Sequence, residues 1–564
     1  MDRRLIPVSA PRCETTINSA EQNNGISFQY VWTALSETFP DRPALICEGK
    51  TVTWSQFNER AARLAGLFSD NGVTNGASVG MYMLNCNEYT EAHFGCFKQS
   101  VCPVNVNYRY RAEELIYLLD NSDAEVVIYH ASYAPRIAEI RDSLPKIKLY
   151  IQVEDESGNP LLDGALDYER ALGNSTPLAF TPCAYDDRYM LYTGGTTGMP
   201  KGVMYDNGAL AHWLCIGGYT SRGLPPPTSI DEVLAGAKAI TEMGAVHRSL
   251  PACPQMHGTG MWIGTMVALN CGGTVITQRT QHLDADALLQ CVVDNEVTDL
   301  TIVGDAFARP ILAALDAAKA VGKPYDLSRV GQIASSGVMW SSEIKEGLLE
   351  HQDMVLNDIM GSTEGSMGGS ISTRDNAAKT AKFSIAEYVK VFNEDDEPVA
   401  PGSGEMGMVA TAGIVPRGYY KDEEKSARTF RTVNGVRYSF PGDFATVEAD
   451  GSITLLGRGS QCINTGGEKV FTEEVEESIK RHDDVEDCLV VGLPDERLGN
   501  RVVAVYSQKL GTAPIGEDGL REHVRSQLAG YKAPKQAICV DLVQRAPNGK
   551  ADYKWAKATA EAHQ

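Results

Sequence analysis

A loop rich in glycine and threonine, with one lysine, offers the clearest chemistry in the sequence. Residues 192–203 read YTGGTTGMPKGV and directly follow the short apolar run Tyr189–Leu191. We therefore expect a strand to enter a loop whose backbone can take positive φ and approach a ligand closely. Backbone N–H groups, threonine hydroxyls and Lys201 would then converge on one small volume, which suits a polyphosphate. A glycine-rich surface turn is the alternative, but the hydroxyls beside a lysine favour the phosphate site.

Two further short motifs carry groups that suit a nucleotide. Residues 361–365 read GSTEG, in which the hydroxyl suits a phosphate oxygen and the carboxylate suits a hard cation such as Mg²⁺. In Pro441-Gly442-Asp443 the carboxylate can accept hydrogen bonds from two hydroxyls at once. A lone GSTEG could equally be the capped start of a helix. Its position downstream of the glycine loop favours phosphate and metal binding.

Several other catalytic classes are disfavoured. The loop is not the G-x-x-x-x-G-K-[ST] motif of P-loop kinases, because Lys201 is followed by Gly202. Neither G-x-S-x-G nor H-E-x-x-H occurs, so serine hydrolases and zinc proteases lack their defining residues. Residues 402–407 match G-x-G-x-x-G, but no helical pattern follows them, which argues against a dinucleotide site.

Charge and cysteine content narrow the partners and the compartment. The net charge is −22, and the sequence contains no cluster of basic residues of the kind that binds nucleic acid. Both observations argue against nucleic acid as a partner. The 13 cysteines form no C-x-x-C pair, and the N-terminus MDRRLIPVSAPRC lacks the apolar core of a secretory signal. We therefore expect a cytoplasmic protein with reduced thiols. Residues 261–276 are too short and too interrupted by polar and glycine residues to cross a bilayer, so no integral membrane segment is expected.

The groups above need a scaffold, and the pattern along the chain predicts an α/β one. Helical patterns at 54–70, 112–120, 284–295 and 307–320 alternate with short strand-like runs at 79–83, 125–129, 273–276 and 300–303. This alternation predicts doubly wound parallel sheets. Residues 205–250, with three consecutive prolines, are expected to form an irregular insertion, and residues 385–456 an antiparallel β unit. After Arg458 the pattern predicts a separate, small α+β domain.

Taken in order, these motifs and five others resemble those of the adenylate-forming superfamily. Acyl-CoA synthetases, firefly luciferase and the adenylation domains of peptide synthetases belong to it. The other motifs are PQMHG at 254–258, SSGVM at 335–339, LGR at 456–458, NTGGEKV at 464–470 and PNGK at 547–550. Residues 301–312, 413–443 and 530–541 are similar to bacterial fatty-acyl-CoA synthetases, nearest to the branch that activates long-chain fatty acids and steroid side-chain acids.

The resemblance implies a role for each matching residue. Nucleotide binding is implied for Thr193, Gly194, Gly195, Thr196, Thr197, Gly198, Lys201, Ser336, Gly337, Asp358, Met360, Gly361, Thr363, Asp443 and Arg458. Catalytic roles are implied for Lys550, Thr193, Glu364 and His257, and Mg²⁺ binding for Glu364. An acyl pocket is implied at Trp213, Gly217, Gly218, His257 and Gly258, and a loop for the thioester step at Gly466, Gly467 and Lys469.

The resemblance also implies the order of domains. A loosely ordered N-terminus (1–25) precedes an AMP-binding domain (26–457) made of doubly wound α/β subdomains and a β-rich subdomain. A hinge (458–460) then leads to a small, mobile α+β domain (461–564). The chain departs from the family pattern at three positions. Met360 replaces an aromatic residue, Ser460 the usual hinge aspartate or lysine, and Thr472 the usual proline.

The implied enzyme is an acid–thiol ligase that uses ATP, Mg²⁺ and coenzyme A. It would adenylate a bulky apolar carboxylic acid, a fatty acid or a steroid side-chain acid, and then form the CoA thioester. Two alternatives stay open: an acyl-AMP ligase that loads a separate carrier protein, and a non-catalytic nucleotide-binding protein on the same fold. A homodimer is also left open.

Replacing Lys550 separates the two half-reactions. The resemblance to the adenylate-forming superfamily implies that this lysine stabilises charge during adenylation and leaves the site before thioester formation. We expect Lys550→Ala to slow acyl-AMP formation by about 10²-fold, the scale for losing one preorganised charge stabiliser. Thioester formation from supplied acyl-AMP should change far less. Equal losses in both assays would contradict the division of labour.

Overall fold

The chain divides into two compact units. The structure is a computed structural model that describes residues 25–193, 199–376, 380–465, 468–495, 498–546 and 549–563. The first unit comprises the described residues of Met1–Ser366, Ile371–Ala378 and Ala412–Ser439, and the second those of Met367–Ser370, Lys379–Thr411 and Phe440–Gln564. The N-terminal segment expected to be loosely ordered lies outside the described residues, apart from Gly25.

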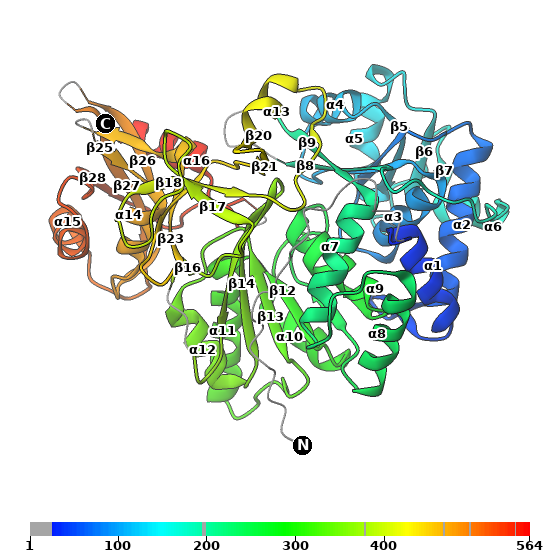
Figure 1. Cartoon of the computed structure of the whole chain (residues 1–564), viewed down its shortest axis with the longest axis horizontal. Helices are drawn as coiled ribbons and strands as arrows, with labels where there is room; N and C mark the ends of the chain where they lie inside the picture. The colour runs from blue at the N-terminus through cyan, green and yellow to red at the C-terminus, as the bar shows by residue number, and fades with distance from the viewer. Residues whose placement is uncertain are drawn as a thin grey trace. The chain divides into compact units, whose positions relative to one another are not determined.

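Two mainly parallel sheets form the frame of the first unit (Figure 1). One has the order β19 (Gly418–Tyr419), β9 (Lys201–Asp206), β8 (Arg188–Thr193), β4 (Cys102–Asn105), β3 (Ser78–Tyr82), β5 (Ala124–His130), β6 (Leu149–Val153), β7 (Leu166–Asp167). The other runs β14 (Val355–Ser362), β13 (Gln332–Ser336), β12 (Asp299–Ile302), β10 (Arg248–Pro251), β11 (Thr274–Thr277), β1 (Pro43–Cys47), β2 (Lys50–Thr53). The pairs β1–β2, β8–β9 and β9–β19 are antiparallel.

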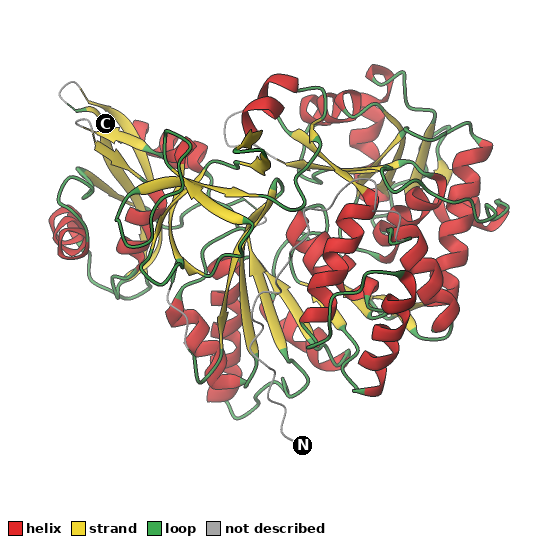
Figure 2. Ribbon diagram, viewed as in Figure 1, coloured by secondary structure: helices red, strands yellow, loops and turns green. Residues whose placement is uncertain are grey.

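Helices cover these sheets, as the red elements of Figure 2 show. They are α1 (Phe28–Thr38), α2 (Trp54–Asp70), α3 (Asn87–Gln99), α4 (Ala112–Asn121), α5 (Ala134–Ile140), α6 (Tyr168–Asn174), α7 (Asn207–Thr220), α8 (Ile230–Glu242), the π-helix η3 (Thr259–Met266), α9 (Val267–Asn270), α10 (Ala285–Asp294), α11 (Gly304–Ala320), α12 (Ser342–His351) and α13 (Glu423–Thr429). The hairpin β20 (Phe430–Val433) and β21 (Val436–Ser439) completes the first unit. Strands β3–β5 are almost wholly apolar and buried, as parallel strands covered on both faces require.

Local sequence explains where several helices begin. Thr53 caps α2, and its side chain and that of Gln56 form a reciprocal capping box. The helix presents Trp54 and Phe57 to the core, where Phe57 packs against Phe94 with ring centroids 4.9 Å apart. The predicted helix at 54–70 and the alternation around it are confirmed.

The expectation of an irregular insertion at 205–250 is wrong. This stretch contains α7 and α8, and the prolines 225–227 lie in the connection between the two helices. Proline breaks a helix only when it lies inside one, and here Ser229 caps α8 just after the proline run.

The second unit combines an antiparallel sheet with a small α+β sheet. The first contains β16 (Lys382–Phe383), β23 (Ile453–Arg458), β22 (Asp443–Val447) and β18 (Met406–Thr411), to which β17 (Val389–Phe392) pairs. The second contains β25 (Glu468–Val470), β24 (Ile463–Thr465), β27 (Gly499–Gln508), β26 (Val485–Asp495) and β28 (Gln536–Cys539), with α14 (Thr472–Lys480), α15 (Gly516–Gln527) and α16 (Tyr553–Ala562). The predicted antiparallel region and the final α+β sheet are confirmed. Strand β15 (Gly365–Ser372) is divided between the units.

A buried charge network ties the end of α7 to the sheet. Arg222 Nη2 donates to both carboxylate oxygens of Asp299, at 2.8 and 2.6 Å. His247 Nδ1 lies 3.2 Å from the same carboxylate. Burial alone would raise the pKa of the Asp299 carboxyl, but Arg222 and His247 hold that pKa well below its usual range. The charge is therefore retained inside the protein.

Removing Arg222 should measurably destabilise the fold. Arg222→Ala leaves the buried Asp299 carboxylate without its guanidinium, which typically costs about 3–5 kcal/mol. Urea unfolding followed by circular dichroism measures the loss. The control is Arg428→Ala, since both side chains of its pair with Glu424 are exposed and the pair should be worth about 1 kcal/mol or less. Equal effects of the two substitutions would contradict this account.

Candidate active site

The glycine-rich loop connects two antiparallel strands. Thr193 ends β8, Lys201 begins β9, and the two residues are cross-strand partners. Five predicted nucleotide-binding residues, Gly194, Gly195, Thr196, Thr197 and Gly198, lie outside the described residues. Both ends of the loop are nevertheless anchored in the sheet, so Thr193 and Lys201 frame its opening.

A buried asparagine joins this strand to the predicted histidine motif. Asn105 Nδ2 donates to the carbonyls of Tyr192 and Met256, at 2.9 and 2.6 Å, and Asn105 Oδ1 accepts from Tyr192 N at 2.6 Å. Residue Asn105 ends β4, so the clamp sits at the carboxyl end of parallel strands, the edge where open α/β sheets bind ligands. It thereby places the neighbouring His257, which is half-buried, at this edge.

The same segment reaches the second sheet. Thr259 Oγ1 donates to the carbonyl of Ser336 at 3.5 Å, at the end of β13. The exposed Gly337 follows with φ +96°, a conformation that favours glycine. The segments that carry the predicted residues Thr193, His257 and Ser336 are thus linked by the hydrogen bonds of Asn105 and Thr259.

A second cluster surrounds the predicted metal-binding residue. Tyr419 Oη donates to Glu364 Oε1 at 2.8 Å, and Tyr205 Oη donates to the carbonyl of Thr363 at 2.9 Å. These two tyrosines come from β19 and β9, so they fix the turn between β14 and β15 against the loop-bearing hairpin.

Two lysines and an aspartate complete this cluster. Lys201 pairs with Asp422, which also caps α13 by accepting from Lys425 N at 3.0 Å. Lys425 Nζ lies 4.7 Å from the centroid of the Tyr419 ring. Burial and the neighbouring Lys201 lower the pKa of Lys425. The cluster therefore offers two cationic groups beside a carboxylate, a set suited to phosphates with their cation.

The carboxylates of this cluster determine which kind of Mg²⁺ site it can form. This ion usually binds proteins through one or two carboxylates and takes its other oxygens from phosphates and water. Glu364 offers one carboxylate, whereas that of Asp422 is paired with Lys201. Within the described ranges, no group of three or more His, Cys, Asp or Glu residues could hold a metal. The site thus fits a cation that arrives with a nucleotide and not a resident ion in a protein cage.

Two predicted residues on β14 have different surroundings. Met360 is buried. Asp358 forms a buried ion pair with Lys345 Nζ at 2.7 Å, and burial raises the pKa of its carboxyl. The carboxylate of Asp358 therefore joins β14 to α12. Gly361, Thr363 and Glu364 follow at the end of the strand and in the next turn.

The predicted acyl-pocket residues differ in the space around them. A Cβ at Gly217 would meet nothing within 4 Å, whereas one at Gly218 would lie 2.5 Å from Cys271 Sγ and 3.2 Å from the Val267 carbonyl. Gly218 therefore serves close packing of α7 against its neighbours, whereas Gly217 is exposed and has open space beside it. The half-buried Trp213, one turn earlier, shares this face of α7. Gly258 has little room, since a Cβ there would lie 3.3 Å from the Trp262 ring.

In the second unit, Asp443 carries a notable orphan atom. Its Oδ1 accepts from Arg458 Nε at 3.3 Å, while Oδ2 is buried without a hydrogen-bond partner among the described residues. Such an orphan suits a ligand hydroxyl. Gly466 and Gly467 lie outside the described residues, as does the side chain of Lys469. Lys550 is exposed, and its carbonyl accepts from Ala546 N at 2.8 Å.

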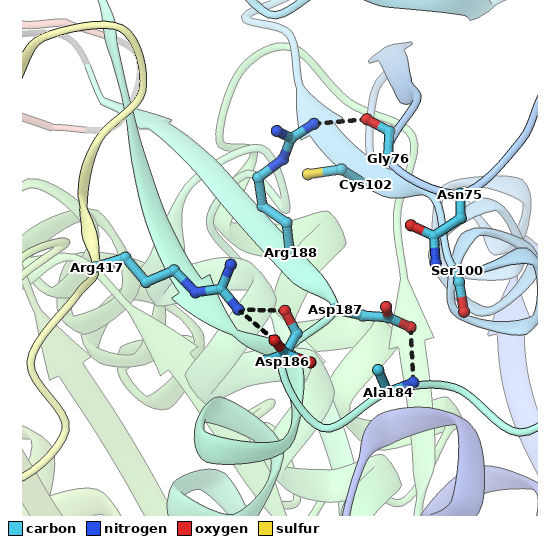
Figure 3. A pocket seen from close by; sticks show the side chains of 9 residues that line it. All are labelled: Asn75, Gly76, Ser100, Cys102, Ala184, Asp186, Asp187, Arg188 and Arg417. Carbon is cyan, nitrogen blue, oxygen red and sulfur yellow. Dashed lines mark hydrogen bonds and ion pairs between the residues drawn. The ribbon is translucent and has the colours of Figure 1, made fainter. Parts of the chain in front are cut away.

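A pocket of about 350 Å³ lies at the opposite end of β8 (Figure 3). Its charged groups already have protein partners: Arg188 donates to the Gly76 carbonyl at 2.8 Å, and Arg417 pairs with Asp206. Asp187 accepts from Ala184 N at 3.2 Å. A pocket with such balanced charge, six residues from the glycine loop along β8, does not fit the phosphate site.

Comparisons with known proteins agree with this geometry. Residues 32–420 match the model for the AMP-binding enzyme family, and residues 474–550 match that for the AMP-binding enzyme C-terminal domain. The chain belongs to the AMP-binding enzyme family. It is 42% identical over 530 residues to a medium/long-chain-fatty-acid–CoA/3-oxocholest-4-en-26-oate–CoA ligase of Mycolicibacterium smegmatis, covering 93% of this chain and 95% of the relative.

Further similarities point the same way. A 3-oxocholest-4-en-26-oate–CoA ligase of Rhodococcus rhodochrous is 42% identical, covering 92% of this chain and 93% of the relative. Among solved structures, an anthranilate CoA ligase in complex with anthranoyl-AMP superposes with a TM-score of 0.78 at 20% identity, covering 94% of this chain and 97% of that one. The last likeness concerns the fold alone. No helix in the described part of the chain has the length and apolar character needed to cross a membrane.

Several residues of the cluster were not predicted from sequence. They are Asn105, Tyr205, Tyr419, Asp422 and Lys425. Three of these residues, Tyr419, Asp422 and Lys425, lie within 413–443, a stretch whose sequence is similar to the ligase branch but does not indicate any contact. Asn105 had one weak signal, a polar residue directly after the buried run of β4.

Replacing the Glu364 carboxylate tests the metal assignment. Glu364→Gln keeps the size and can still accept from Tyr419, but it removes the charge that Mg²⁺ needs. We expect a large loss of acyl-AMP formation, partly recovered at high Mg²⁺, in a pyrophosphate-release assay. Tyr419→Phe is the matched control, because it removes the same hydrogen bond and keeps the carboxylate. A Glu364→Gln enzyme with wild-type activity would reduce Glu364 to a structural role.

Proposed function

We propose that this protein is an ATP-dependent, AMP-forming acyl-CoA ligase for a bulky, apolar monocarboxylic acid. The proposal rests chiefly on the relatives at 42% identity that span over nine-tenths of the chain and are named as fatty-acid and steroid-acid CoA ligases. The clustering of Lys201, Glu364 and Lys425 beside Thr193 supports it independently, because these groups suit a polyphosphate.

In the first half-reaction, a carboxylate oxygen of the acid attacks the α-phosphorus of ATP. The bond to pyrophosphate breaks, and acyl-AMP forms. Thr193 and Lys201 would hold the leaving pyrophosphate, and Thr363 would bind the α-phosphate. When phosphate replaces Asp422 beside Lys201, this aspartate would still cap α13. Mg²⁺, held by Glu364 together with the nucleotide, would neutralise phosphate charge.

The nucleoside would be held by polar groups. We assign Asp443 to the ribose hydroxyls, since its orphan Oδ2 can accept a hydrogen bond that the described residues do not supply. Ser336 and Gly337 would bind the adenine, with Met360 offering thioether packing in place of an aromatic ring. The ion pair of Asp358 with Lys345 would hold β14, the strand that carries Met360, against α12.

In the second half-reaction, a thiol displaces AMP from the acyl group. We propose coenzyme A as the thiol, with Gly466, Gly467 and Lys469 lining its path. By family resemblance, the C-terminal domain turns about residues 458–460 between the two steps and withdraws Lys550. If a carrier protein is the acceptor instead, acyl-AMP will form without any thioester when CoA is supplied. We place the reaction in the cytoplasm and leave a homodimer to be tested by sedimentation.

The acid is inferred from the apolar face of α7. Trp213 and Gly217 lie on that face, and no lysine or arginine occurs between Lys201 and Arg222. A second carboxylate would therefore lack a partner along this helix. Each buried CH₂ adds roughly 0.8 kcal/mol, so a long or polycyclic acid should exceed acetate by several decades in kcat/KM. A panel of acids assayed for AMP release tests this order, and acetate or a dicarboxylate at the top would refute it.

Filling the space at Gly217 should change acid selectivity. Gly217→Trp is expected to lower kcat/KM for the bulky acid by about tenfold or more, since a few excluded methylenes suffice. The value for a short acid should change little. Gly217→Ala is the control, because its methyl group meets nothing and improves helix propensity. If Gly217→Trp leaves the preference for bulky over short acids unchanged, the acyl pocket does not lie on this face of α7.

A further inference from the structure

The junction between β23 and the C-terminal sheet contains a carboxylate clamp. Strand β23 ends at Arg458, a short 3₁₀ turn covers Gly459–Gln461, and β24 begins at Ile463. From the first turn of α14, Glu473 Oε2 accepts a hydrogen bond from the backbone N of Arg458 at 3.1 Å. A side chain of the small final domain therefore accepts a hydrogen bond from Arg458, the last residue of β23.

Gly457 makes room for this clamp. A Cβ at Gly457 would overlap Glu473 Oε2, and its φ of +129° is one that other residues rarely adopt. A ring contact between Phe444 of β22 and Phe471, just before α14, lies at the same junction, with the two centroids 5.5 Å apart. Glu473 thus supplies a polar contact between α14 and β23.

We propose that Glu473 is a positioning residue, a latch that holds the C-terminal domain against β23 in one of its two working arrangements. This inference rests on the proposed function, because that function needs the domain to turn about residues 458–460. Turning there must break a hydrogen bond from Arg458 to α14. Glu473 would thereby set the balance between adenylation and thioester formation, without touching a substrate.

The electrostatic surroundings make the latch sensitive to pH. Asp443 and Arg458 face Glu473 from β22 and β23, while Glu476, one turn further along α14, and Tyr553 of α16 face it from its own domain. Lys480 and Arg545 act on Glu476. Burial, with Asp443 adding to it, raises the pKa of Glu473 to about 7, and burial together with Glu473 raises that of Glu476 to about 8.

The direction in which pH acts on the latch follows from the direction in which the pKa of Glu473 is shifted. The latched state raises the pKa of Glu473 above the ordinary 4.5 of a glutamate. Latching is therefore fully supported below that ordinary value and weakens as the pH rises towards the latched value. Alkaline conditions should release the junction.

Amide hydrogen exchange of Arg458 tests the latch directly, because its N–H is the donor. In the full-length enzyme without substrates, after correction for the intrinsic rate at each pH, Glu473→Ala should lose protection about tenfold, the scale for one hydrogen bond. Wild type should lose protection between pH 5 and pH 8. Glu473→Gln keeps the acceptor but cannot titrate, so its protection should persist and be nearly independent of pH.

The matched control is Glu474→Gln. Glu474 pairs with Lys532 at 2.6 Å, so removing its charge should leave the protection of the Arg458 amide unchanged. In separate half-reaction assays, Glu473→Ala should shift acyl-AMP formation and thioester formation in opposite directions. Wild-type protection of Arg458 in Glu473→Ala, or equal losses in both half-reactions, would overturn the latch. If no acid yields AMP, the proposed function fails while the exchange measurement still decides the latch.

Discussion

The geometry of the candidate site depends on the three buried hydrogen bonds of Asn105. One short amide side chain satisfies the backbone of Tyr192 on one side and the carbonyl of Met256 on the other. Both backbones approach at the end of a parallel strand, where the sheet supplies no further partners. An apolar residue here would leave buried N–H and C=O groups unpaired, each costing about 1–3 kcal/mol. The loop strand and the histidine segment are held at one edge for this reason.

Charge compensation explains how the site can exist before a nucleotide binds. Lys201 has a carboxylate partner in Asp422, and Glu364 has a phenol donor in Tyr419. Each ionic group thus has a protein partner that a phosphate or a cation can replace. All four residues come from the first unit, and two of them belong to the segment around α13. The polar frame is therefore assembled from parts of the chain more than two hundred residues apart.

The sequence predicted those features that depend on local patterns. The helix at 54–70 could be predicted because Thr53 and Gln56 cap it and its apolar spacing is regular. The region 205–250 could not, because α7 is apolar on nearly every side and the adjacent prolines suggested irregular structure. Motif residues such as Thr193 and Glu364 were identified by resemblance. The partners Asn105 and Tyr419 were not, because tertiary pairing between distant segments leaves no periodic signal.

The π-helix Thr259–Met266 has a consequence for how this site diverges among related sequences. Its wider turn is seen where the backbone N–H of Val267, directly after the helix, donates to the carbonyl of Trp262, five residues back. A π-turn accommodates one more residue than the α-helical turn it replaces, and it is less stable. Because the wider turn holds that extra residue, losing a single residue here would relax the segment into an α-helix while the residues that follow keep their orientation. A gap at this point in an alignment of related sequences would therefore indicate a differently shaped segment beside His257, even where every motif is retained.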